Sequence, residues 1–233
     1  MAGRARIATV TGGERIYGGA SAAARVEKRR ASLLDAALTE MAESRWRAVT
    51  VASLCSEARL NKRYFYESFD DLDQLANAVI ELVATEVGAA AIGSYLETVE
   101  STLGEQARNA VAAVVDVLGA DRRKALVLLG GVPIATSQDA QRRAAISGLT
   151  TVLVEHARKI HDVALESDSL ASTGPAFVIG GTAQTILSWV NGDLLLSREQ
   201  LIDDITALWL ALGESASGIA RSRFAPQARD LLP

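Results

Sequence analysis

The segment that most restricts the fold of this chain is Thr50–Leu72, which reads TVASLCSEARLNKRYFYESFDDL. Its apolar side chains recur at helical spacing in two short runs, with Arg59 and Leu60 between them. Thr50 and Asn61 stand before the two runs, and both residue types are favoured at the N-terminal cap of a helix. The segment therefore predicts two short helices joined by a tight turn.

Helical patterns of apolar residues continue through the rest of the 233-residue chain, which contains only four prolines. Ala and Leu are abundant, and both favour helices. We therefore predict an all-α fold, with one or two domains for a chain of this length. The expected helices cover residues 25–42, 51–58, 61–69, 71–92, 122–131, 137–164, 175–191 and 198–221. A further helix is expected within Glu97–Leu118, with a stop at Gly119.

Capping and breaking residues set several of these expected boundaries. Asp70 is expected to cap the helix that follows it, and Gly93 is expected to end that helix. Pro175 suits the first position of a later helix, because that position needs no backbone N–H. Ser197 and Gln200 have the spacing of a capping box and predict the start of the last helix.

The charge of the chain is distributed unevenly along its length. Residues 1–69 carry twelve Lys and Arg against seven Asp and Glu, a net charge of +5. Residues 70–233 carry twelve against twenty-one, a net charge of −9, so the whole chain has a net charge of −4. A basic N-terminal third on an acidic body predicts that one end of the molecule binds a polyanion.

The segment Thr50–Phe69 resembles the helix-turn-helix of the TetR family of transcriptional regulators. The matching residues are Thr50-Val51, Leu54-Cys55, Ala58-Arg59-Leu60, Asn61 and Phe65-Tyr66-Glu67-Ser68-Phe69, and the resemblance extends from about Arg25 to Val79. It implies a three-helix DNA-binding domain followed by a larger helical domain for ligand binding and dimerisation. It also implies a repressor that a small-molecule ligand releases from DNA.

Side-chain chemistry in the same segment is consistent with contact to duplex DNA. A recognition helix places its first residues in the major groove, where an arginine can bond the edge of guanine. The predicted DNA-binding residues of the helix-turn-helix, residues 50–69, are Thr50, Asn61, Lys62, Arg63, Tyr64 and Tyr66. Phe65 and Phe69 lie four apart on one helical face and are predicted to be core. Taken alone, Lys62 and Arg63 would be an ordinary solvated pair, and Thr50 an ordinary cap.

Two positions depart from the family pattern. Arg59 stands where the family usually has glycine, so it needs a left-handed backbone or a different turn. Leu72 stands where a lysine often contacts the DNA backbone. Basic residues near the N-terminus could compensate by entering the minor groove, or could form only a solvated helix start. These residues are Arg25, Lys28, Arg29 and Arg30.

The resemblance and the residue pattern together predict four parts of the chain. They are a flexible basic tail over residues 1–24, a helix-turn-helix domain over 25–70, a linking helix over 71–92 and a regulatory and dimerisation domain over 93–233. We expect a homodimer on a palindromic operator, because one short recognition helix gives little affinity. Its surface is expected to include Phe177, Leu187, Val190, Leu201, Ile205, Leu208 and Leu212. A small apolar effector is expected in the second domain, with no residue assigned to it.

The residues give little support for an enzyme or a metalloprotein. His156 and His161 are the only histidines and are five residues apart, so they do not share a helical face. No serine or cysteine is placed beside a histidine, and Cys55 is expected in the core. We therefore predict no catalytic residue, no metal and no cofactor. The remaining alternative is a helical interaction protein whose basic end binds RNA or an acidic protein.

Cysteine content and hydropathy predict a soluble, cytoplasmic protein. The single cysteine excludes an internal disulfide and fits a reducing compartment. The longest uninterrupted apolar run, Ala125–Ala135, is too short to span a bilayer and contains Pro133. No membrane partner is expected.

Overall fold

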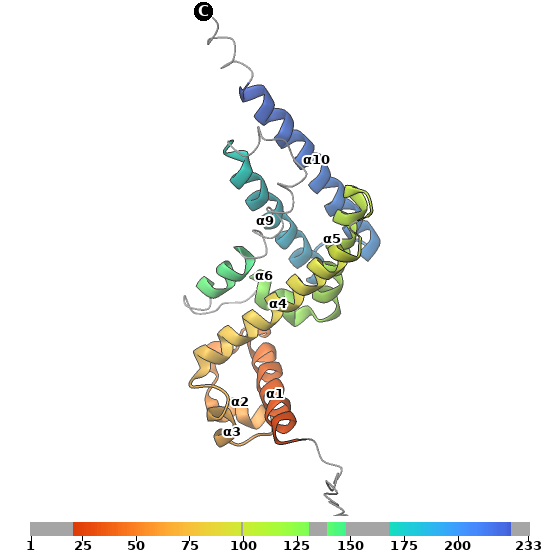
Figure 1. Ribbon diagram of the computed structural model, residues 1–233. Helices are drawn as coiled ribbons and strands as arrows, with labels where there is room; N and C mark the ends of the chain where they lie inside the picture. The colour runs from red at the N-terminus through yellow and green to blue at the C-terminus, as the bar shows by residue number, and fades with distance from the viewer. Residues whose placement is uncertain (1–20, 99, 131–138, 148–167, 225–233) are drawn as a thin grey trace, which may run out of the picture.

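The computed structural model describes residues 21–98, 100–130, 139–147 and 168–224, and all regular structure in these ranges is helical (Figure 1). The named elements are α1 Ala22–Ala42, η1 Trp46–Ala48, α2 Val51–Glu57, α3 Lys62–Tyr66, α4 Leu72–Glu97, α5 Leu103–Ala120, α6 Arg122–Leu129, α9 Leu170–Val190 and α10 Arg198–Phe224. Residues 139–147 are also helical. The predicted all-α class is confirmed.

The first three helices form one end of the molecule, and α4 leads from them to the helices of the other end (Figure 1). Leu33 and Met41 of α1, Leu54 of α2 and Phe65 of α3 are almost completely buried and share one core with α4. α1 starts at Ala22, before the expected start at Arg25, because the Ser21 hydroxyl accepts a hydrogen bond from the Ala24 N–H. Residues 1–20 of the predicted tail lie outside the described residues.

The start and the end of α4 both differ from expectation. Asp71, not Asp70, caps the helix, since its carboxylate accepts the Gln74 N–H at 2.7 Å. The Gln74 side chain in turn accepts the Asp70 N–H at 2.6 Å. The helix does not end at Gly93 but continues to Glu97. A glycine within a continuous apolar helix costs only about 1 kcal/mol, which is too little to end it.

By length and composition alone, α4 is apolar enough to cross a membrane. In the structure it is instead a core helix. Its inward face, which includes Leu75, Val79, Ile80 and Val83, is almost fully buried against α1, α5 and α6. Packing therefore explains the apolar character of this inward face, while Leu82, Ile92 and Leu96 of the same helix are exposed.

The other end of the molecule consists of α5, α6, α9 and α10 (Figure 1). α5 passes over Gly119, where the sequence predicted a stop, and ends at Ala120. A Cβ atom at Gly119 would lie 2.9 Å from Cζ3 of Trp189 in α9. Gly119 therefore allows two helices to approach closely and does not end α5. Of the expected helix over 137–164, only residues 139–147 are described, and they are helical.

α9 begins five residues earlier than the sequence predicted. Pro175 lies inside the helix, which starts at Leu170 because the Asp168 carboxylate accepts the Leu170 N–H at 2.8 Å. The predicted end before Gly192 is confirmed, with φ of 82° at that glycine. The predicted capping box of Ser197 and Gln200 at the start of α10 is also confirmed, with distances of 3.0 and 3.2 Å.

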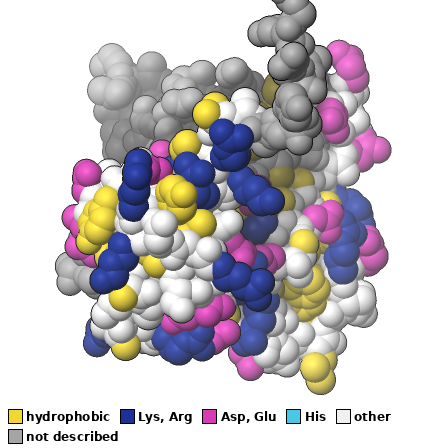
Figure 2. Space-filling model, turned by 90° about the horizontal axis from the view of Figure 1, so that it is seen from below, with side chains coloured by type: hydrophobic (Ala, Val, Ile, Leu, Met, Phe, Trp, Pro, Cys, Tyr) yellow, Lys and Arg dark blue, Asp and Glu magenta, His cyan; other side chains and the backbone are white. Residues whose placement is uncertain are grey.

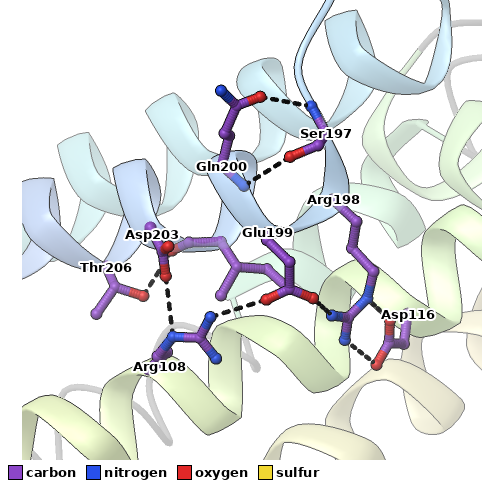
Figure 3. Close-up of polar contacts among 9 residues, drawn as sticks. Arg108, Asp116, Ser197, Arg198, Glu199, Gln200, Asp203 and Thr206 are labelled. Atoms are coloured by element: carbon purple, nitrogen blue, oxygen red, sulfur yellow. Dashed lines mark hydrogen bonds and ion pairs between the residues drawn. The ribbon is translucent and has the colours of Figure 1, made fainter.

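Ion pairs hold α10 on α5 (Figure 3). Arg108 of α5 contacts Glu199 and Asp203 of α10, each at 2.9 Å. Arg198 of α10 contacts Asp116 of α5, with Nη2 at 2.6 Å from Oδ2. Each helix therefore contributes both an arginine and a carboxylate to these ion pairs, which fix the register of α10 along α5.

A second set of polar contacts joins the two ends of the molecule through α6. The Arg123 guanidinium donates to the Thr39 hydroxyl at 2.7 Å and pairs with Asp35 at 3.0 Å, both on α1. It also pairs with Asp121, and the pKa of that carboxyl is held below its ordinary value mainly by this hydrogen bond. The next residue, Lys124, pairs with Glu86 of α4 at 2.6 Å.

Candidate nucleic-acid interface

Helices α2 and α3 are joined by a short turn, and local hydrogen bonds fix both of their starts. Thr50 caps α2 in a capping box with Ser53, with the Ser53 N–H 3.1 Å from the Thr50 hydroxyl. Asn61 caps α3, with its Oδ1 3.3 Å from the Tyr64 N–H. Both predicted caps are confirmed. The Asn61 and Thr50 oxygens are thus engaged with backbone, while the rest of each side chain faces solvent.

The turn between the helices is a Schellman motif. The Leu60 N–H donates to the Cys55 carbonyl at 2.8 Å, and the Arg59 N–H donates to the Ser56 carbonyl at 3.1 Å. Arg59 occupies the left-handed position with φ of 53°. Of the two alternatives that the sequence left open at Arg59, a left-handed backbone or a different turn, the structure has the left-handed backbone. A non-glycine residue in this conformation costs about 1–2 kcal/mol, which the surrounding structure must offset.

The start of α3 presents polar side chains to solvent, while its aromatic residues divide between core and surface. Lys62 and Arg63 are exposed, and the Arg63 side chain is 83% exposed. Phe65 is completely buried, and Tyr66, with 60% exposure, is free to present its hydroxyl outward. α3 ends at Tyr66, earlier than the expected end at residue 69, and the chain turns so that Phe69 also enters the core.

Tyr64 is half-buried, because an arginine of α1 covers its ring. The Arg29 guanidinium carbon lies 4.2 Å from the Tyr64 ring centroid. A second arginine of α1, Arg30, lies over the Phe69 ring at 5.1 Å. These cation–π contacts dock the basic start of α1 on α3. From the sequence, Arg29 and Arg30 could either contact DNA or form a solvated surface, and these rings were not predicted as their partners.

Glu67, which follows α3, lies at this site but was not among the residues predicted from the sequence. Its carboxylate lies 3.0 Å from Arg63 Nε and 3.5 Å from an Arg29 terminal nitrogen. The (i, i+4) spacing of Arg63 and Glu67 is a signal for their pairing that the sequence already contains. The contact with Arg29 depends on tertiary packing and carries no such local signal.

Cations without a carboxylate partner gather at this end of the described structure. Most described cations of the opposite end form ion pairs: Arg108, Arg123, Lys124, Arg142, Arg143, Arg198 and Arg223. Lys28, Arg47, Arg59 and Lys62 have no such partner among the described residues. Figure 2, which looks onto the end that carries α2 and α3, shows Lys and Arg side chains spread over this face. The arrangement leaves positive charge available to a polyanion.

Leu72, the second departure from the family pattern, lies at the start of α4 and is half-buried against the core. It therefore supplies packing and no polar group to the surface. Asp70 and Asp71 beside it are engaged with Gln74 at the helix start. Any contact of this region with an anion must come from other residues.

The described residues contain no group of three or more His, Cys, Asp or Glu placed to hold a metal ion. His156 and His161 lie outside the described residues. Cys55 is buried, as predicted, and burial raises the pKa of its thiol, which disfavours the nucleophilic thiolate.

Known proteins resemble this chain in structure and not in detectable sequence. No protein-family model matches the chain, and no curated protein matches it. A TetR-family transcriptional regulator from Streptomyces coelicolor aligns with a TM-score of 0.63 at 17% identity, over 85% of this chain and 89% of that chain. FadR from Bacillus subtilis, a transcriptional regulator solved with stearoyl-CoA, aligns with a TM-score of 0.60 at 16% identity, over 77% and 96%.

AibR, solved in complex with isovaleryl coenzyme A and operator DNA, has a TM-score of 0.59 at 15% identity, over 77% of this chain and 97% of that chain. The three alignments each cover more than three quarters of this chain. At such identities the likeness establishes architecture alone. This chain therefore has the fold of the TetR-family transcriptional regulators.

Proposed function

We propose that this protein is a sequence-specific DNA-binding transcriptional regulator that reads duplex DNA with α3. The observation that carries this proposal is the exposed polar start of α3, which lies among cations without carboxylate partners. An exposed helix start of this kind fits the major groove, and the surrounding cations suit phosphate contact. The division into a DNA-binding part over 25–70 and a regulatory part over 93–233 belongs to the same proposal.

Each predicted DNA-binding residue receives a role from its position. Arg63 and Lys62, at the exposed start of α3, would face base edges. Thr50, at the start of α2, would meet a phosphate with its hydroxyl and the neighbouring amides. Asn61 would stay near the groove as the cap of α3, and Tyr66 would meet the DNA backbone. Tyr64 would contribute through its hydroxyl edge, since Arg29 covers its ring.

The protein would act as a homodimer through α9 and α10, because one recognition helix binds weakly. Of the seven residues expected on this surface, Leu187, Leu201 and Ile205 are buried within the chain. Three others stay exposed: Phe177 at 70%, Leu208 at 60% and Leu212 at 37%. Gly180 and Gly181 of α9 have open space where a Cβ would lie. Large apolar side chains beside bare backbone suit close helix packing between two copies.

Control of DNA binding would come from a small apolar effector in the larger helical domain, with the regulator acting as a repressor in the cytoplasm. FadR and AibR were each solved with an acyl-CoA molecule. Such a ligand would act by binding one spacing of the two recognition helices more tightly than another.

Selection of bound duplexes from a random pool tests the proposed function directly. A palindromic consensus sequence would support both specific DNA binding and a dimer. Equal retention of all duplexes, or preference for single-stranded RNA over duplex DNA in a matched competition, would contradict the proposal. The second outcome would favour the alternative of an RNA-binding interaction protein.

A further inference from the structure

The carboxylate of Glu67 lies between two arginines that belong to different helices. One oxygen, Oε1, lies 3.0 Å from Nε of Arg63, and the other, Oε2, lies 3.5 Å from Nη2 of Arg29. The Glu67 side chain is 35% exposed, whereas the Arg63 side chain is 83% exposed. Glu67 thus sits behind Arg63, closer to the body of the domain.

Arg63 contacts Glu67 through Nε, so the two terminal nitrogens of its guanidinium stay available for another partner. Donation from Nε to Glu67 leaves both terminal nitrogens of the guanidinium without a partner among the described residues. Guanine offers two acceptors, O6 and N7, on its major-groove edge, and a guanidinium meets them with two parallel hydrogen bonds. A fixed guanidinium also loses less rotamer freedom when it binds.

Glu67 is itself held from the opposite side. Arg29 contacts its second oxygen while its guanidinium lies over the Tyr64 ring at 4.2 Å. The Arg29 side chain is only 23% exposed, so this contact is more sheltered than the one with Arg63. Arg29 and Tyr64 therefore restrict where the carboxylate can lie, and the carboxylate restricts Arg63.

We propose that Glu67 is a specificity-determining positioning residue, which holds Arg63 for a guanine and weakens binding to unrelated DNA. The proposal rests on the DNA-binding function proposed above. Its two effects share one cause. The carboxylate orients Arg63 toward a correct base, and its negative charge beside the recognition helix repels phosphates whatever the sequence. The orientation of Arg63 increases the ratio of specific to non-specific binding, and the repulsion lowers the affinity for every duplex alike.

Glu67→Gln tests this proposal, because glutamine keeps the shape of the side chain and removes its charge. The probes are the duplex selected from the random pool, the same duplex changed at the base pair whose preference Arg63→Ala relaxes, and a scrambled duplex. The matched control is Glu57→Gln, which removes an exposed charge at the end of α2 where no ion pair with Arg63 exists. Circular dichroism confirms that each variant is folded.

We expect Glu67→Gln to reduce discrimination at the Arg63-dependent base pair by about fivefold or more. Affinity for the scrambled duplex should rise by about twofold to fivefold, as for removal of one exposed charge. Glu57→Gln should leave discrimination unchanged. In an Arg63→Ala background, Glu67→Gln should no longer affect discrimination, because the residue that it positions is absent.

Several outcomes would overturn the role of Glu67 while leaving the proposed function intact. One is unchanged discrimination with specific DNA binding preserved. Another is an equal loss of affinity for all duplexes, which would show that Glu67 only stabilises the packing of α1 against α3. If the unmodified protein selects no duplex at all, the proposed function itself fails.

Discussion

Replacement of Arg59 by glycine tests two separate effects of this residue: its effect on the free energy of unfolding and its effect on the affinity for DNA. Arg59 has φ of 53° at the left-handed position of the turn between α2 and α3. Glycine removes the strain of this conformation, which stabilises the folded state by about 1–2 kcal/mol. Glycine also has more conformational freedom in the unfolded chain, which lowers the free energy of unfolding by about 0.5–1 kcal/mol. We therefore expect Arg59→Gly to raise the free energy of unfolding by about 0.5–1 kcal/mol.

The same turn geometry at the end of α1 supplies a matched control. Ser44 has φ of 59°, and the Arg45 N–H donates to the Glu40 carbonyl at 3.0 Å, as in the turn after α2. Ser44→Gly should therefore stabilise the protein by a similar amount without removing a charge. Urea denaturation followed by circular dichroism measures both variants.

DNA binding should distinguish the two glycine variants. If Arg59 contacts a phosphate, Arg59→Gly removes one such contact from each subunit of a dimer. The slope of log affinity against log salt should then become shallower by about two, and affinity should fall by about fivefold to thirtyfold. Ser44→Gly should change neither. An unchanged salt slope for Arg59→Gly would refute the phosphate contact, and a failure of both variants to stabilise would refute the estimate of strain.

Three further substitutions test other contacts. Arg63→Ala should cost about 1–3 kcal/mol of specific binding and relax the preference at one base position in a selection experiment; an unchanged consensus would contradict its placement in the groove. Tyr66→Phe should weaken binding to all duplexes equally, by about 0.5–1.5 kcal/mol in a titration, because a backbone contact carries no sequence information. Arg123→Ala should destabilise the protein at neutral pH in urea denaturation. Because Arg123 lowers the pKa of Asp121, its contribution is present above the ordinary aspartate range and is lost as the pH falls, so the difference from the unmodified protein should shrink in acid.

Local patterns in the sequence were sufficient to predict the helix-turn-helix. Thr50 and Asn61 act as caps because each bonds a backbone N–H only three residues away. Phe65 and Phe69 enter the core because their spacing places them on one face, and the ring centroids lie 6.0 Å apart. At Arg59 the sequence left two alternatives open, a left-handed backbone or a different turn, and the structure has the first.

Errors arose where distant packing outweighs a local preference. Gly119 was expected to end a helix, but it admits the Trp189 ring, whose Nε1 donates to the Leu196 carbonyl at 2.9 Å. Gly93 has no neighbour within 4 Å of the position of a Cβ, and α4 continues past it to Glu97 although Ile92 and Leu96 are exposed. The partners of Arg29 lie on another helix, so no spacing in the sequence identifies them.

α6 connects the larger helical end of the molecule to the end that carries α1 and α3. α6 packs against α9 on one side and against α1 and α4 on the other. Arg123 and Lys124, in its first turn, form ion pairs with Asp35 of α1 and Glu86 of α4. A shift of α6 must therefore either carry α1 and α4 with it or break both ion pairs. Because α1 is also docked on α3 through Arg29 and Tyr64, we infer that movement of α1 would reorient α3, the helix that we propose reads DNA.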